Sequence, residues 1–253
     1  MTAILQTKNL CKFFGGLTVT QNVNLSLEAG ARHALIGPNG AGKTTLINQL
    51  TGVLRQSSGS IWLNGEDISR LPPHQRVRRG LARTFQINSL FPNLTPLEAV
   101  TAAICERDRD QLSLLDRRLF PLTRRRAEID EAYRLLEHLN LADVCLRATH
   151  ELAYGKQRLL EVALAMAVKP QVLLLDEPAA GVPEGESDEM FAVLAAMPRD
   201  ISILLIEHDM SLVFRFAERI TVLVSGSELV SGTPQEIAAD TRVQEVYLGK
   251  SHG

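Results

Sequence analysis

One loop organises this chain: Gly37-Pro38-Asn39-Gly40-Ala41-Gly42-Lys43-Thr44-Thr45, which matches the pattern G-x-x-x-x-G-K-[ST]. The loop follows the apolar run Ala34-Leu35-Ile36 and precedes a helix-like run at 46–50. A strand, a glycine-rich loop and a helix in this order bring loop N–H groups and the positive end of the helix dipole to one anion. The alternative is a glycine-rich turn in an ordinary strand–helix unit. The full pattern in this setting favours a phosphate site.

The residue types within the loop have separate roles in binding a nucleoside triphosphate. Gly37, Gly40 and Gly42 permit positive φ and let the backbone come close to a ligand. The Lys43 cation can reach the β- and γ-phosphates, and the Thr44 hydroxyl is a ligand for Mg²⁺. We therefore expect residues 37–45 to bind a nucleoside triphosphate together with Mg²⁺.

The composition is that of a soluble protein with a sizeable core. Of the 253 residues, 45% are hydrophobic and 22% are charged, which suits one large α/β domain or a core with a subdomain. Lys and Arg number 27 and Asp and Glu 29, so the net charge is −2. Nucleic-acid binders are more often basic. We therefore expect no nucleic-acid partner.

Cysteines and apolar runs bear on location. The three cysteines are an odd number without C-x-x-C spacing, so we expect neither a disulfide framework nor a zinc site. We expect the protein to work in a reducing cytoplasm. Residues 1–8 lack the apolar stretch of a signal peptide, and no run approaches the roughly 18 apolar residues of a membrane span. Any work at a membrane is expected to go through a partner.

Hydrophobic periodicity divides the chain into an α/β core and a helical insertion. Alternating runs in residues 1–30 predict antiparallel strands, and the apolar runs 172–175 and 201–206 predict buried parallel strands. Residues 220–224 and 228–231 predict a closing hairpin. The predicted divisions are an α/β core at 1–86 and 160–232, a helical subdomain at 87–159 and a helical tail at 233–253.

Helix signals are clearest in the middle of the chain and beside the buried strands. Thr95-Pro96-Leu97-Glu98 combines a cap residue, a proline at the first helical position and a glutamate three residues after the cap. Apolar spacing predicts further helices near 124–140, 159–168 and 184–197. Because strands and helices alternate, the sheet is expected to be mainly parallel.

Two adjacent carboxylates, Asp176 and Glu177, end the first buried strand. Open α/β sheets bind ligands at this end of their strands. A phosphate-loop enzyme needs an acid there to hold Mg²⁺, which suits Asp176, and Glu177 is then placed to act as general base on a water. The alternative is that Asp176 only caps the turn before Pro178. The phosphate loop upstream favours the metal role.

Two further polar residues, His208 and Gln86, follow strands. His208 ends the second buried strand, so it can share a sheet edge with Glu177 and face the phosphates. Gln86 follows a strand-like run where the helical insertion leaves the core, and its amide can reach Mg²⁺ or water. Each has a plain alternative: a structural histidine and a surface glutamine.

Together these residues resemble an ATP-binding cassette (ABC) transporter ATPase over nearly the whole chain. The motifs, in the family's order, are Gly37–Thr45, Gln86, Leu152-Ala153-Tyr154-Gly155-Lys156-Gln157-Arg158, Leu173–Pro178 and His208. The resemblance implies a phosphate-loop core of mainly parallel sheet, an N-terminal antiparallel β subdomain and a helical subdomain.

The finer resemblance is to the uptake ATPases of branched-chain amino acid importers. The residues that carry it are Phe14-Gly15-Gly16, 80–86, Leu152–Arg158 with Leu160-Glu161, 177–181 and Val246-Tyr247-Leu248-Gly249. Related importers of amides, urea and other small solutes share these features. The cargo therefore stays open.

The resemblance implies how ATP and Mg²⁺ would be held. Phe14 would stack on adenine, and Lys43 with the loop amides would hold the phosphates. Thr44 and Gln86 would ligate Mg²⁺, with Asp176 binding it through water.

The resemblance also implies the catalytic roles and a second ATPase. Glu177 would activate water and His208 would sense the γ-phosphate, beside Lys43 and Gln86. Two ATPases would close head to tail, so that Ala153-Tyr154-Gly155-Lys156 of one complete the ATP site of the other. A helix beginning just after this segment would aim its N-terminal dipole at the γ-phosphate.

The chain departs from the family pattern at three places. The family usually has Ser where this chain has Ala153, so a hydroxyl for the γ-phosphate is missing, and Gln where it has Lys156. Losing a charge-assisted hydrogen bond costs on the order of 1.5–3 kcal/mol, which a cation at Lys156 near the polyanion would partly offset. Val182-Pro183 stands where the family has Leu-Asn-Pro or Leu-Asp-Pro, so a polar contact across the dimer is missing.

The leading hypothesis is the ATP-hydrolysing subunit of an importer for branched-chain amino acids or a related small solute. It would sit at the cytoplasmic face of the cell membrane with two permease subunits and a second ABC ATPase of the same or a paralogous chain, and would serve a solute-binding protein indirectly. One alternative is a soluble non-transport cassette ATPase, regulatory or associated with translation or DNA. Another is a nucleotide-binding module without hydrolysis, which Glu177 and His208 disfavour and Ala153 keeps open.

Overall fold

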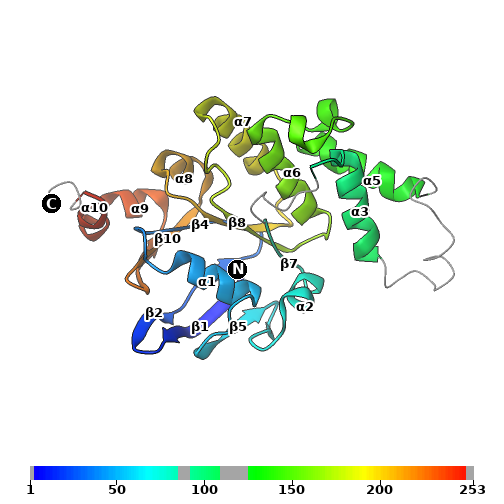
Figure 1. Ribbon diagram of the computed structural model, residues 1–253. Coiled ribbons are helices and arrows are strands. Elements are labelled where there is room, and N and C mark those ends of the chain that lie inside the picture. Colours follow the sequence, from blue (N-terminus) through cyan, green and yellow to red (C-terminus); the bar gives the residue numbers. More distant parts are fainter. Residues whose placement is uncertain (1–2, 85–91, 109–124, 249–253) are drawn as a thin grey trace. The chain divides into compact units, whose positions relative to one another are not determined.

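The structure is a computed structural model, and it describes residues 3–84, 92–108 and 125–248. The chain forms two compact units, which are described separately. The first, here the core unit, comprises Met1–Arg83, Gln171–Pro178 and Met197–Gly253, and the second, here the helical unit, comprises Thr84–Pro170 and Ala179–Ala196. Figure 1 shows the elements of both units along the chain.

The core unit contains a sheet with the strand order β11-β10-β4-β9-β8-β7. Its strands from β10 to β7 pair in parallel, and only β10 and β11 are antiparallel. The bounds are β4 Arg32–Ile36, β7 Leu81–Arg83, β8 Val172–Asp176, β9 Ser202–Ile206, β10 Arg219–Val224 and β11 Ser227–Gly232. The predicted parallel sheet and its closing hairpin are confirmed. Continuous apolar runs form β8 and β9 because strands covered on both faces have no solvent side.

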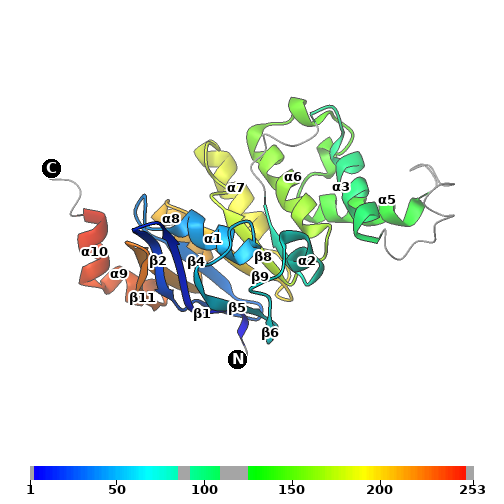
Figure 2. The same ribbon diagram turned by 60° about the horizontal axis from the view of Figure 1, so that its bottom comes forward.

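A second, antiparallel sheet of the core unit is built on the long strand β1, Ala3–Phe14, which pairs with three other strands. The other strands are β2 Leu17–Val23, β3 Ser26–Glu28, β5 Ser58–Leu63 and β6 Glu66–Asp67. Helix α1, Lys43–Thr51, contributes Leu46, Ile47 and Leu50 to an apolar cluster shared with both sheets. The helix itself lies beside β2 of this sheet and β7 of the parallel sheet (Figures 1 and 2). The predicted antiparallel strands at the N-terminus are confirmed.

Short helices complete the core unit. Helix α2, Pro73–Arg78, begins after Pro72, and α8, Met210–Phe216, is capped by the Asp209 side chain. After β11 the chain continues as α9, Pro234–Ala239, and α10, Thr241–Leu248, shown in red shades in Figure 1.

The helical unit consists of α3 Pro96–Arg107, α5 Arg126–His138, α6 Tyr154–Met166 and α7 Glu184–Ala195, with 3-10 turns at Ala142–Val144 and Thr149–Glu151. Helix α3 begins with the capping box read from Thr95 and Glu98: the Thr95 hydroxyl accepts from the Glu98 N–H, and the Glu98 carboxylate accepts from the Thr95 N–H. Helix α6 begins five residues before the predicted 159, because apolar spacing does not mark its polar first turn.

The boundaries of the helical unit differ from the predicted segment 87–159. The unit continues to Pro170 and takes in 179–196, so α6 and α7 belong to it. Both helices have apolar stripes that pack within this unit, and the sequence pattern of an apolar helix does not say which neighbour it packs against.

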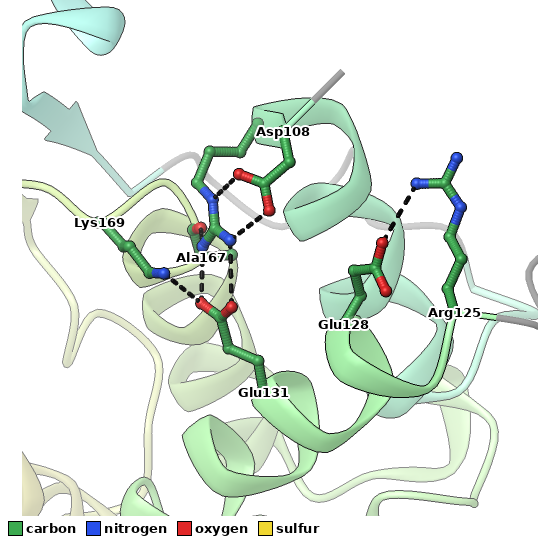
Figure 3. A network of polar contacts seen from close by, with 7 residues as sticks. Asp108, Arg125, Glu128, Glu131, Ala167 and Lys169 are labelled. Carbon is green, nitrogen blue, oxygen red and sulfur yellow. Dashed lines mark hydrogen bonds and ion pairs between the residues drawn. The ribbon is translucent and has the colours of Figure 1, made fainter. Parts of the chain in front are cut away.

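An ion-pair network ties three helices of the helical unit together (Figure 3). Arg107, at the end of α3, donates to Asp108, to Glu131 of α5 at 2.7 and 3.1 Å, and to the carbonyl of Ala167 after α6 at 2.9 Å. Lys169 adds an ion pair to Glu131 at 3.1 Å. Hydrogen bonds from Arg107 are the largest cause that lowers the pKa of Glu131, to about 2. The network therefore stabilises the packing of α3, α5 and the end of α6.

Replacing Arg107 is expected to destabilise the helical unit in a pH-dependent way. The folded pKa of Glu131 is about 2, below its ordinary 4.5, so this carboxylate contributes its full stability above about pH 4.5 and loses it as the pH falls towards 2. Because the groups are partly exposed, we expect Arg107→Met to cost about 1–2 kcal/mol at pH 7 and less at pH 4. Urea unfolding at both pH values measures the difference.

The matched control is Arg134→Met, which removes an exposed arginine of α5 whose hydrogen bond, within the described part of the chain, goes to the Asp130 carbonyl of its own helix. A loss equal to that of Arg107→Met, or a cost that does not shrink between pH 7 and 4, would contradict the role of the network.

Candidate functional site

The glycine-rich loop connects β4 to α1. At two of its positions another part of the backbone lies so close that only glycine fits. Gly42 has a φ of 100°, and a Cβ there would lie 2.6 Å from the carbonyl oxygen of Val19. A Cβ on Gly37, whose φ is 154°, would overlap the carbonyl oxygen of Leu223. The backbone therefore packs too closely for any side chain at either position. Helix α1 starts directly after Gly42, so its free N–H groups point at the loop.

Lys43 is buried against the loop that it follows. Its Nζ donates to the carbonyl oxygens of Gly37 at 2.6 Å and Pro38 at 3.2 Å. Burial lowers the pKa of Lys43, while the nearby carboxylates of Glu177 and Asp176 raise it in part. Lys43 of the loop and the carboxylates of Asp176 and Glu177, at the end of β8, are therefore close enough to influence one another electrostatically.

The two carboxylates stand at the end of β8 in different backbone conformations. Asp176 is the last residue of the strand, whereas Glu177 has a φ of 48°, in the left-handed region. Its N–H donates to the carbonyl of Ile206 at 2.9 Å, which holds this turn against β9. A left-handed non-glycine residue costs roughly 1–2 kcal/mol. Such strain is typical of positions where function needs a side chain in one direction.

An arginine that sequence reasoning missed pairs with Asp176. Arg83, the last residue of β7, donates to Asp176 Oδ2 at 2.6 Å and to Asn48 Oδ1 of α1 at 2.8 Å. The ion pair joins residues 93 positions apart. No residue spacing in the sequence predicts a contact between residues this far apart.

His208 lies at the same sheet edge as Glu177, because β8 and β9 are neighbouring parallel strands. Its side chain is 66% exposed, and its Nδ1 lies 3.6 Å from the buried Glu207 carboxylate. The backbone N–H of His208 also donates to Glu207. The imidazole is thus free to face a ligand on the solvent side.

Of the other predicted nucleotide contacts, Phe14 is at the end of β1 with half of its surface exposed. The Lys12 ammonium lies 4.9 Å from the centre of its ring. An exposed aromatic ring at a strand end is available to stack on a base. Gln86 lies outside the described residues.

The loop also lies close to the C-terminal helix of the core unit. A hollow of about 370 Å³ is lined by Pro38, Asn39, Gly40, Ala41, Val224, Ser225, Glu245 and Val246. Burial raises the pKa of Tyr247 to about 12, and its hydroxyl lies near the Gly37 backbone without reaching hydrogen-bond geometry. In the sequence Tyr247 stood out only as part of the finer resemblance, with no link to the loop.

The donor atoms near Lys43 fit Mg²⁺. Among the residues that the structure describes, no three or more His, Cys, Asp or Glu are grouped to hold a metal by themselves. The Thr44 hydroxyl and the Asp176 carboxylate are oxygen donors, and Mg²⁺ takes one or two protein oxygens together with phosphates and waters. This donor set suits an ion that arrives with a nucleotide.

The segment Ala153-Tyr154-Gly155-Lys156, predicted to complete the partner's ATP site and here called the signature segment, lies in the helical unit and forms the start of α6. Ala153 is the N-cap and offers no side-chain hydrogen bond, and Tyr154 is the first helical residue. The helix therefore begins within the segment and not just after it. The Gly155 N–H donates to Glu186 Oε2 of α7 at 2.8 Å, and Lys156 forms an ion pair with Asp143.

A buried arginine one turn after the start of α6 holds the first residue of that helix in place. Arg158 donates to the Tyr154 hydroxyl at 2.6 Å and to the Ala180 carbonyl at 3.2 Å, and it pairs with Glu161 at 3.2 Å. Burial raises the pKa of Glu161 to about 7, even though Arg158 lowers it in part. Arg158 therefore fixes the orientation of Tyr154 relative to the loop that leads into α7.

Comparison with known proteins identifies the family of this chain from two matching segments. The profile of the ABC transporter family matches residues 20–180, and that of a branched-chain amino acid ATP-binding cassette transporter family matches residues 229–253. The chain belongs to the ABC transporter family. As a member, it is an ATP-binding subunit and an ATPase.

Several relatives of this ABC ATPase span almost its full length. The high-affinity branched-chain amino acid transport ATP-binding protein BraF of Pseudomonas aeruginosa is 40% identical over 252 residues, with 98% of each chain covered. LivG of Escherichia coli, of the same description, is 39% identical over 253 residues, again with 98% of each chain covered. A crystal structure of the ADP conformation of an ABC transporter ATP-binding cassette has a TM-score of 0.86 and 30% identity, covering 98% of this chain and 100% of that one. Within the described parts of the ABC ATPase, no helix has the length and apolar character to cross a membrane.

The first turn of α6 in this ABC ATPase has a different cap from the one that the family pattern leads us to expect. Where the family has a serine at the N-cap, this chain has Ala153, and a carboxylate from α7 takes the free N–H of Gly155 in its place. An anion at a helix N-terminus stabilises the helix through its dipole. Lys156, which the resemblance implies as a cation near a polyanion, forms an ion pair with Asp143 of the same unit.

Glu186→Ala is therefore expected to destabilise α6 by about 1 kcal/mol, because the helix then has no side-chain cap from either helix. Ala153→Ser should recover part of that loss in the Glu186→Ala background and have a smaller effect alone, since Glu186 already satisfies the Gly155 N–H. Urea unfolding of the four proteins in a double-mutant cycle measures the coupling. Glu189→Ala, an exposed carboxylate of the same helix α7, is the control. Equal effects of Ala153→Ser in both backgrounds would show that the two caps are not related.

Proposed function

We propose that this ABC ATPase drives uptake of branched-chain amino acids or a related small solute through separate membrane permeases. The observation that carries the proposal is the near full-length identity of 40% and 39% to two branched-chain amino acid transport ATP-binding proteins, joined to the C-terminal match at 229–253. That C-terminal segment includes α10, which lies beside the phosphate loop. The segment that matches the branched-chain family therefore includes residues that line a hollow with the glycine-rich loop, which supports the proposal.

In this proposal the core unit binds ATP with residues at the ends of three strands, β1, β4 and β8, and Gln86 is expected to join them. Lys43 and the loop amides hold the phosphates, the exposed Phe14 stacks on adenine, and Thr44, Asp176 and Gln86 hold Mg²⁺. The bound metal neutralises charge that develops on the phosphates. Thr44 is exposed on the first turn of α1, so its hydroxyl is accessible to an ion at the loop.

Hydrolysis falls to the residues at the strand ends. The carboxylate of Glu177, held by its left-handed backbone, orients a water and accepts its proton. His208, exposed at the same edge, contacts the γ-phosphate. A proton leaves the water for Glu177 while the chain's own cation at Lys43 stabilises the phosphate charge.

A second ATPase subunit completes the site. The segment Ala153-Tyr154-Gly155-Lys156 of one subunit faces the nucleotide of the other, with the positive end of α6 directed at its γ-phosphate. The partner is a second copy or a paralogue. Two permease subunits hold the pair at the cytoplasmic face of the membrane, and a solute-binding protein delivers the solute to the permeases.

Glu177→Gln should preserve ATP binding and lower ATP turnover about a hundredfold or more, because an amide cannot accept the proton of the attacking water. Without hydrolysis, subunits with ATP should accumulate as a dimer, which size-exclusion chromatography with and without ATP measures. Glu189→Gln, an exposed carboxylate on α7, should turn over ATP as the parent does. Ordinary turnover in the Glu177→Gln protein would remove Glu177 from the role of base.

Cells that lack this chain should lose uptake of radiolabelled leucine, isoleucine and valine, and the restored chain should co-purify with polytopic membrane proteins from solubilised membranes. A Lys43→Ala chain should still co-purify but not restore uptake, because it loses the cation that binds the phosphates. Recovery of the chain with nucleic acid or ribosomes and without any membrane protein would favour the non-transport alternative. If uptake of branched-chain amino acids is unchanged but uptake of another solute is lost, the proposed cargo is wrong and the assignment as an importer subunit stands.

A further inference from the structure

Arg83 of the core unit bridges the two elements that carry the proposed magnesium ligands. It is the last residue of β7, and its guanidinium donates to Asp176 Oδ2 at the end of β8 at 2.6 Å and to Asn48 Oδ1 of α1 at 2.8 Å. Only 19% of the arginine and 18% of the aspartate side chain is exposed. A short charge-assisted bond between groups so little hydrated is strong. One oxygen of Asp176 is therefore committed to a protein cation.

The position of Asn48 places this cation on a particular face of α1. Thr44 and Asn48 are four residues apart in the helix, so both lie on the same face, one turn from each other. Arg83 thus contacts Asp176 and the face of α1 that carries Thr44. These are the two described residues to which the proposed function assigns Mg²⁺.

Other buried arginines of the core unit have a different kind of partner. Arg32 donates to the carbonyls of Met197, Pro198 and Ile201, and Arg76 donates to four carbonyls around the end of α1. Each of these arginines satisfies backbone oxygens at the end of an element, as a structural arginine does. Arg83 instead pairs with a carboxylate that the mechanism requires for another cation.

We propose that Arg83 competes with Mg²⁺ for the Asp176 carboxylate. Before the metal binds, Arg83 neutralises Asp176, which stands next to a second carboxylate at Glu177. Mg²⁺ that arrives with ATP meets the repulsion of a guanidinium already on its ligand, so more Mg²⁺ is needed to form the loaded site. The inference rests on the proposed assignment of Asp176 to Mg²⁺. It gives Arg83 the part of a positioning residue that sets how much Mg²⁺ the cassette requires.

The test measures Mg²⁺ binding apart from hydrolysis. In the Glu177→Gln background, binding of a fluorescent ATP analogue is titrated with Mg²⁺ to give the Mg²⁺ concentration at half-saturation. Arg83→Met keeps the length and apolar stem of the side chain but removes its charge. We expect the half-saturating Mg²⁺ concentration to fall about three- to tenfold, because the repulsion is gone. The melting temperature without nucleotide should fall as well, because Asp176 then has no partner.

Two controls separate charge from structure. Asn48→Ala removes the second anchor of Arg83 but leaves its charge beside Asp176, so half-saturating Mg²⁺ should stay within about twofold of the parent. Arg83→Lys keeps a cation and should also stay near the parent. If Arg83→Met does not fold, Arg83→Gln supplies a second neutral variant that retains a hydrogen-bond donor.

The outcomes distinguish this inference from the proposed function. Asp176→Asn should raise half-saturating Mg²⁺; if it does not, the assignment of Asp176 to Mg²⁺ fails and the inference with it. If Asp176→Asn raises it while a folded neutral variant of Arg83 leaves it unchanged, the competition alone is overturned and Arg83 is structural. In the unaltered protein, the guanidinium ¹⁵N signal of Arg83 should shift with Mg²⁺ and ATP but not with ATP alone; equal shifts under both conditions would also overturn it.

Discussion

The register of three parallel strands is the constraint on which the site depends. Ile206 of β9 pairs with Leu35 of β4 on one side and with Asp176 of β8 on the other, so the three strands end level with one another. The chain leaves parallel strands in the same direction, and the phosphate loop, Glu177 and His208 therefore follow one edge. A slip of one residue in β8 would exchange Asp176 with a buried leucine, and complete burial of these strands makes that slip costly.

Charge at this edge is balanced by groups that lie far apart in the sequence. Lys43 is held by loop carbonyls and by the field of two carboxylates, and Arg83 is held by one of those carboxylates. Each of these two cations is thus paired with oxygen atoms of the protein itself. If Mg²⁺ and phosphate bind here as proposed, Lys43 and Arg83 would exchange these protein partners for new ones, and that exchange would contribute to the free energy of binding.

The helical unit shows how a departure from a family pattern can be absorbed. Ala153 removes the cap from α6, and Glu186 supplies a carboxylate to the same turn from α7. The Arg107 network then joins the far end of α6 to α3 and α5. Both ends of the signature helix are thus anchored within its own unit.

The amino-acid sequence is sufficient to identify the phosphate loop, the buried strands with Asp176 and Glu177 at their end, and the cap at Thr95. Each of these is a local pattern, in which the residues that act together are neighbours along the chain. The partners of Arg83, the cap that Glu186 provides and the approach of Tyr247 to the loop came only from the tertiary structure. These contacts join residues 93, 31 and 210 positions apart (247 − 37 for the last), and periodicity carries no information about pairs at such separations. The start of α6 was missed for a related reason: its first turn is polar, and its cap comes from another helix.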